Sequence, residues 1–237
     1  MPVALESMNI VLRGPFAPAM FSPRWLRDAD LVGQDEFESA QINIISQDQT
    51  SFELGWLVVS VGHDIMQLQT SEVEEFPRLR DAAIGVLRSL EKQQLWALGV
   101  NRQVHVRVSS REAMHRAGDV LAPKDPWDGV LELAAVRSLY MWGARPDGWA
   151  GRINVRVEPS EAVHPGIFVQ LNDHSDLHES SIDDRTRENA FDIELGSGEA
   201  SEAKARVAIR YLSENWDDVM QRWFAIVDRV TDIAEGS

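Results

Sequence analysis

The chain has 237 residues, of which 44% are hydrophobic and 26% are charged, a composition typical of folded globular proteins. It contains no cysteine, which excludes disulfides, thiolate nucleophiles and metal centres held by cysteine. Its formal net charge of −15 disfavours binding to nucleic acid and to anionic lipid. No stretch is apolar for long enough to span a bilayer, and Met1 to Asn9 lacks the pattern of a secretion signal, so we expect a cytoplasmic protein with no membrane contact.

The first half of the chain predicts strands followed by a helix. A short strand is expected over Asn9–Arg13, and Ser22 before Pro23 marks the start of a short helix. Alternating apolar residues then predict an antiparallel meander, with strands at Ala40–Ile45, Phe52–Val61 and Ile65–Thr70. Apolar residues at helical spacing predict an amphipathic helix over Ser71–Lys92.

The second half repeats this order of elements. A strand is expected over Trp96–Val108, and the capping spacing Ser109-x-x-Glu112 predicts a short helix after it. Three further strands are predicted at Ala135–Ala144, Arg152–Glu158 and Gly166–Asn172, followed by a long C-terminal helix. The sequence therefore predicts an α+β fold of two pseudo-duplicated β-β-β-α units, whose antiparallel sheets are separate or continuous and are covered by helices.

Composition also suggests how the chain is divided. We expect an N-terminal lobe over residues 1–121, a linker with two prolines over 122–129, and a C-terminal lobe over 130–237. Residues 171–237 contain 16 acidic and 7 basic residues, a net charge of −9, and Ser175–Ser201 is expected to form a mobile acidic loop. One hypothesis is therefore that this acidic region imitates nucleic acid and occupies a basic partner.

An apolar stripe runs along the expected terminal helix. From Ala205 to Ile233 its members recur at alternating spacings of four and three residues, which predicts a continuous rod with one apolar seam. The stripe either covers the protein's own sheet or contacts a partner, and large aromatic residues would then dominate that contact. The candidate partner-binding residues are Leu212, Trp216, Val219, Trp223 and Ile226.

An Asp/His cluster follows the last predicted strand. Asp173, His174 and His178 are candidate catalytic residues, and His174, Asp176 and His178 are candidate metal ligands. Two histidines four residues apart can bind one metal if they lie on a helix, which suggests a metal-assisted hydrolase. Asp and Asn are also common in turns, so we favour a solvated turn for the same residues.

Polar residues also interrupt a predicted buried strand. Asn101, Arg102 and His105 lie there, and with Asn172 they are candidates for a polar site. If the two halves meet, Arg102 can pair with Asp173, either as a structural bridge or as part of an anion site, and we favour the structural bridge. No phosphate-binding loop or nucleophile elbow occurs, so no cofactor is expected.

Several motifs carry a resemblance to known proteins. Ile10-Val-Leu-Arg-Gly14, Phe16-x-Pro18-x-x-Phe21-x-Pro23-x-Trp25-Leu26, Leu98-Gly-x-Asn-Arg102, Val163-His-Pro-Gly166 and Asn172-Asp-His174 resemble a group of uncharacterised bacterial proteins over most of the chain. That resemblance implies no activity. The segment Phe16–Trp25, followed by antiparallel strands and helices, is also similar to the export chaperone SecB, an acidic antiparallel α+β oligomer that holds client polypeptides.

These observations lead to one main functional prediction. We expect a non-enzymatic protein-binding subunit, either a homo-oligomer or a component of a bacterial multiprotein assembly, with a chaperone-like or adaptor-like role.

Overall fold

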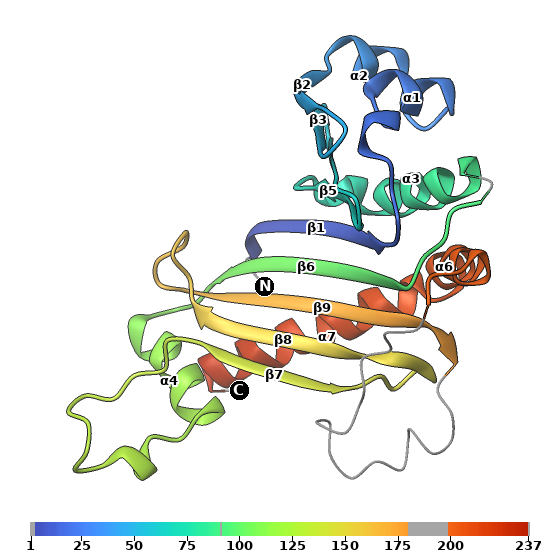
Figure 1. The fold of residues 1–237 in the computed structure, drawn as a ribbon. Coiled ribbons are helices and arrows are strands. Elements are labelled where there is room, and N and C mark those ends of the chain that lie inside the picture. The colour runs from blue at the N-terminus through green and yellow to red at the C-terminus, as the bar shows by residue number, and fades with distance from the viewer. Residues whose placement is uncertain (1–2, 91, 180–198, 237) are drawn as a thin grey trace.

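Two long neighbouring strands, β1 (Val3–Arg13) and β6 (Ala97–Arg107), form the centre of the molecule. The structure is a computed structural model that describes residues 3–90, 92–179 and 199–236. In these residues it has an antiparallel sheet of nine strands in the order β2-β3-β4-β5-β1-β6-β9-β8-β7 (Figure 1). The other strands are β2 (Gln41–Ile45), β3 (Thr50–Leu54), β4 (Leu57–Val61), β5 (Ile65–Thr70), β7 (Leu139–Ala144), β8 (Trp149–Pro159) and β9 (Gly166–Glu179).

Helices are found between and after these strands. They are α1 (Pro23–Asp28), α2 (Gln34–Glu38), α3 (Phe76–Ser89), α4 (Arg111–Leu121), α6 (Glu202–Glu214) and α7 (Trp216–Glu235), and short 3-10 turns occur at η1 (Pro18–Met20), η2 (Val73–Glu75) and η3 (Asp125–Trp127). The predicted start of α1 is confirmed, because the Ser22 hydroxyl accepts a hydrogen bond from Trp25 N at 3.2 Å and Pro23 is the first helical residue.

The predicted α+β fold with duplicated β-β-β-α units is confirmed. In the first half β3, β4 and β5 form a meander that leads into α3, and in the second half β7, β8 and β9 form a meander that leads into α6. The last strand of each meander pairs with the long strand of its own half, β5 with β1 and β9 with β6. The sheet is continuous because β1 also pairs with β6 along its length.

The predicted lobes share this sheet. Strand β6 lies within the residues predicted as the N-terminal lobe, and it is hydrogen bonded to β9 as well as to β1. The predicted linker 122–129 contains η3 and lies in the connection between α4 and β7. Part of the expected acidic loop, residues 180–198, lies outside the described residues.

Two predicted strand boundaries were wrong. The run Phe52–Val61 is a hairpin in which Leu54 pairs with Leu57 across a two-residue turn. Gly55 permits this turn because it adopts a φ of 57°. The strands on both sides of the turn carry buried residues, so the sequence looks like one continuous strand. The strand expected to end at Asn172 continues to Glu179, so Ser175 is part of β9 rather than of a loop.

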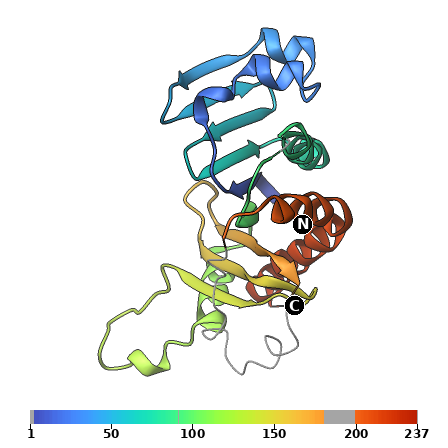
Figure 2. The same ribbon diagram turned by 45° about the vertical axis from the view of Figure 1, so that its right-hand side comes forward.

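The two faces of the sheet differ in character. Helices α3, α4, α6 and α7 pack against one face, and Figure 2 shows α3, α6 and α7 on the same side of the sheet. On β1 the buried side chains Met8, Ile10 and Leu12 point toward these helices and alternate with Asn9 and Val11 on the opposite face. The core therefore lies between the sheet and the helices, and the opposite face, the open face of the sheet, carries mainly polar side chains.

None of the described helices combines the length and the apolar character that a bilayer-spanning segment requires.

Candidate binding surfaces

The apolar stripe of the terminal helix packs within the protein. Trp223 is fully buried, Trp216 is 5% exposed, and Leu212 and Val219 are also buried, whereas Ile226 is partly buried against the same core. The guanidinium of Arg80 on α3 also lies over the Trp216 ring, 5.6 Å from its centre. The candidate partner-binding residues therefore form the face with which α6 and α7 cover the sheet.

The continuous rod predicted from Ala205 to Ile233 was wrong. Helix α6 ends at Glu214, α7 begins at Trp216, and the two run in different directions (Figure 1). Asn215 has a φ of −108° and a ψ of 6°, which are not helical values. Asn favours helix ends, and the Asp217 and Asp218 carboxylates stabilise a new helix N-terminus.

Part of the Asp/His cluster comes together: His174 Nε2 lies 3.1 Å from Asp176 Oδ1, and His178 Nδ1 lies 3.3 Å from the Asp176 carbonyl oxygen. The cluster lies in an extended strand, where successive side chains point to opposite faces, so Asp173 and His174 face opposite sides of the sheet. Between His174 and His178 the strand is irregular, because Leu177 adopts a φ of 61°. In the described part of the chain no group of three or more His, Cys, Asp or Glu side chains is arranged to hold a metal ion. The geometry gives the metal-assisted hydrolase no support.

Asp173 instead belongs to a buried ion-pair network beneath α6 and α7. Its Oδ1 accepts hydrogen bonds from Arg145 Nη1 and from the Tyr211 hydroxyl, the latter at 3.1 Å, and its Oδ2 lies 3.1 Å from Arg222 Nη2. Asp147 completes the network, with its Oδ2 2.6 Å from Arg145 Nη2 and 3.1 Å from Arg222 Nη2. Two carboxylates thus neutralise two guanidinium groups in the core.

The electrostatics of this network stabilise the charged form of Asp147 and the neutral form of Tyr211. Burial opposes ionisation of Asp147, but its hydrogen bonds and attraction to Arg145 outweigh this and hold the pKa of the carboxyl below its usual value. Burial, and then the neighbouring Asp173 charge, raise the pKa of Tyr211 far above its usual value, so the phenol keeps its proton.

Arg102 does not pair with Asp173 as predicted. It lies on the helix-covered face, where its Nε donates to Glu6 Oε1, and its guanidinium lies 4.5 Å from the centre of the Phe224 ring. The two residues are separated because Asp173 has its own cations, Arg145 and Arg222, which come from other parts of the sequence.

The open face of the sheet brings two of the predicted polar residues together. Asn101 and Asn172 are cross-strand neighbours, and Asn172 Nδ2 donates to Asn101 Oδ1. The series continues in both directions, since Asn101 Nδ2 donates to Asn9 Oδ1 at 2.6 Å and Asn154 Nδ2 donates to Asn172 Oδ1 at 2.7 Å. We call Asn9, Asn101, Asn172 and Asn154 the asparagine ladder; it crosses strands β1, β6, β9 and β8.

A polar hollow of about 490 Å³ lies over this ladder. Its lining adds the amides of Gln67, Gln103 and Gln170, and the side chains of Tyr140 and Arg156 at the β7 end. The Tyr140 ring is exposed and packs edge-on against Trp142, with 5.9 Å between ring centres. The sequence prediction missed Asn9, Asn154 and Tyr140. Asparagine inside a strand is disfavoured, and that is the signal that could have identified the first two.

His105 lies four residues from Asn101 on the same open face but has a different environment. Its Nδ1 lies 2.8 Å from the Ser160 hydroxyl, and its ring is 4.8 Å from the Phe168 ring. Burial lowers the pKa of His105, since it disfavours the imidazolium. His105 therefore packs beside the hollow and does not line it.

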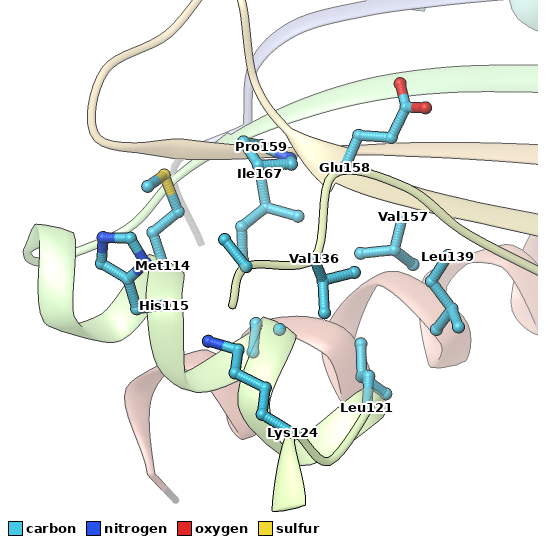
Figure 3. A pocket seen from close by; sticks show the side chains of 13 residues that line it. Met114, His115, Leu121, Lys124, Val136, Leu139, Val157, Glu158, Pro159 and Ile167 are labelled. Atoms are coloured by element: carbon cyan, nitrogen blue, oxygen red, sulfur yellow. The ribbon is translucent and has the colours of Figure 1, made fainter. Parts of the chain in front are cut away.

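A separate apolar pocket lies between α4 and the end of β8. Figure 3 shows Met114 and Leu121 of α4 facing Val136, Leu139, Val157 and Ile167 across it. Its volume is about 100 Å³, below the ~300–1,000 Å³ usual for small-molecule sites. It has room for a single small apolar group.

Two apolar elements are exposed at the periphery. All five residues of edge strand β2 are exposed, with Ile42 at 57%, Ile44 at 42% and Ile45 at 40%. The connection between α4 and β7 projects from the body (Figure 1) and also exposes large apolar side chains, among which Leu133 is 98% exposed. Exposed apolar side chains that cluster are typical of interaction surfaces.

No protein-family model matches the chain, and no curated protein matches it. The resemblances drawn from its motifs therefore stay predictions.

Proposed function

We propose that the chain is a non-enzymatic protein-binding subunit that self-associates by pairing strand β2 of one copy with β2 of a second copy. The observation that carries this proposal is that β2 is an edge strand whose five residues are all exposed and uncharged. The buried stripe of α6 and α7 has no part in this contact, because its aromatic members already pack in the core.

The backbone of β2 supports a strand as the occupant of this surface. In the described part of the chain β2 is hydrogen bonded to β3 along one side, which leaves the outward N–H and C=O groups of the edge available to another strand. Edges of soluble proteins are usually protected by lysine, proline or bulges. Of these protections β2 has only the bulge, at the register shift between Ile42 and Ile44. Its sequence contains neither lysine nor proline.

The side chains of β2 favour a second copy over a partner of different charge. An antiparallel pair of identical strands is related by a twofold axis, so the contact closes as a dimer. Branched aliphatic side chains from the two copies would then meet, and each cross-strand pair contributes about 0.2–1 kcal/mol. A basic partner would gain nothing from a strand without carboxylates.

Charge and size determine how strong this dimer should be. Each copy has a net charge of −15, so two copies repel one another, and added salt should strengthen the dimer by screening that repulsion. A five-residue strand gives a small interface, which is typical of weak and reversible association. We therefore expect a concentration-dependent dimer that functions in the cytoplasm as part of a larger assembly.

Light scattering over a concentration series tests this proposal. The wild-type protein should pass from monomer to dimer, and Ile44→Lys should stay monomeric because it places a charge on the edge. Val73→Lys is the matched control, since Val73 is 48% exposed and lies in η2, outside the edge. A wild-type monomer at the highest concentration, or an Ile44→Lys variant that dimerises as tightly as wild type, would overturn the proposal.

A further inference from the structure

The asparagine ladder has a direction. Each amide donates a hydrogen bond toward β1, from Asn154 to Asn172, then to Asn101, then to Asn9. A primary amide has two N–H donors and a carbonyl with two lone pairs. The inner members of the ladder therefore each retain a donor and a lone pair beyond those the ladder uses.

At the end where the ladder begins, Asn154 has a side-chain oxygen that is unpaired within the described part of the chain. Asn154 is 7% exposed, and its Oδ1 accepts no hydrogen bond from the residues that the structure describes. Asn154 also lines the hollow over the ladder. Buried acceptors are almost always paired, so this unpaired oxygen sets the Asn154 end of the ladder apart from its other members.

From this geometry we infer that the hollow binds a neutral saccharide. The floor consists of uncharged amides and Val11, and the one cation of its lining, Arg156, is already paired with Glu158 at 2.6 Å. An anionic ligand would thus find no free positive charge there. A hydroxyl group donates and accepts at once, which matches a floor of amides that offer both functions.

The aromatic end of the hollow supports the same class of ligand. Tyr140 is exposed, lines the hollow and is held edge-on by Trp142. An aromatic ring offers an apolar face beside polar groups, which suits the mixed C–H and hydroxyl surface of a sugar ring. The volume of about 490 Å³ lies within the ~300–1,000 Å³ range of small-molecule sites.

This inference is independent of the β2 contact. The lining of the hollow comes from β1, β5, β6, β7, β8 and β9, and β2 lies at the far edge of the sheet. A dimer formed through β2 and a saccharide bound over the ladder can each be present without the other.

Nuclear magnetic resonance of the asparagine side-chain amides tests the inference. The full chain would be titrated with the neutral tetrasaccharides cellotetraose and maltotetraose, and with a uridine tetranucleotide as an anionic comparison. We expect one of the saccharides to shift the side-chain N–H signals of Asn101, Asn154 and Asn172 in a saturable way. Absence of any such shift at millimolar saccharide, or binding of the tetranucleotide alone, would overturn the inference.

Two exposed residues of β7 provide matched variants that leave the ladder intact. Tyr140 lines the hollow, whereas its neighbour Met141 points to the opposite face and is similarly exposed. Tyr140→Ala should weaken saccharide binding by about threefold to tenfold, and Met141→Ala should leave it unchanged. Equal effects of the two substitutions would contradict the assigned site.

Discussion

Arg145 Nη1 donates a hydrogen bond to Asp173 Oδ1, and both side chains are inaccessible to solvent. The pair joins the turn after β7 to the centre of β9, and Tyr211 of α6 contacts both residues. Charges in the core are tolerated only when they are paired. Because Tyr211 of α6 and Arg222 of α7 also contact Asp173, the network links both helices to the sheet.

Removal of one partner of this pair should destabilise the fold strongly. Asp173→Ala leaves the Arg145 guanidinium buried without its main counter-charge, and we expect a loss of about 3–5 kcal/mol in the free energy of unfolding. Chemical denaturation measures this. Asp48→Ala is the control, since the Asp48 side chain is 92% exposed and the substitution should cost less than about 1 kcal/mol. Similar losses in both variants would contradict the network's role.

The same network predicts a loss of stability in acid. The pKa of Asp147 is lowered in the folded protein, so the unfolded chain binds a proton at a higher pH than the folded chain does. The stabilisation from Asp147 is present above the ordinary carboxyl pKa of about 3.9 and is lost as the pH falls below it. Asp147→Asn should therefore show a shallower fall of stability below pH 5, measured by denaturation at several pH values. If the stability of the wild type and of Asp147→Asn fell equally with pH, Asp147 would not be the source of the acid sensitivity.

Adjacent aromatic residues on α7 should respond very differently to truncation. Trp223 is fully buried, so Trp223→Ala should cost about 3–5 kcal/mol of stability. Phe224 is 54% exposed and mainly covers the Arg102 guanidinium, so Phe224→Ala should cost about 0.5–1 kcal/mol. Thermal unfolding compares the two. If Trp223→Ala were as stable as the wild type but associated differently, the result would support the apolar stripe of α6 and α7 as a contact surface.

Two glycines of the second half give a sharp test of the backbone. Gly151 has a φ of 124°, and a Cβ there would lie 2.2 Å from the carbonyl oxygen of His174. Gly151→Ala should thus cost at least about 1–3 kcal/mol, because the φ is unfavourable and the obstacle is backbone. A Cβ at Gly143 would meet no atom within 4 Å, so Gly143→Ala should be neutral or slightly stabilising. Denaturation midpoints of the two variants decide between these outcomes.

The periodicity of the sequence was enough to predict the duplicated order of strands and helices. It could not show that β1 and β6 pair with each other, because pairing between distant strands leaves no local pattern. Nor could it identify β2 as an edge. Alternating isoleucines are typical of any half-buried strand, and their exposure depends on whether another strand lies beyond them.

The candidate sites were harder to predict for a related reason. Asp173 has the character of a turn residue in isolation, and its place inside a strand depends on Arg145 and Arg222, which come from distant segments. The break at Asn215 was visible only as a poor helix former within a regular apolar stripe. Asn101 and Asn172 were identified as polar candidates, but their contact required the register of β6 against β9.

Hydrogen exchange of the β2 backbone amides at several protein concentrations tests self-association most directly. If β2 pairs with β2 of a second copy, the outward N–H groups of Gln41–Ile45 should exchange more slowly as the dimer forms, and they should stay fast in Ile44→Lys at every concentration. Fast exchange of these amides in a sample that light scattering shows to be dimeric would contradict the account, because the contact would then lie elsewhere on the protein.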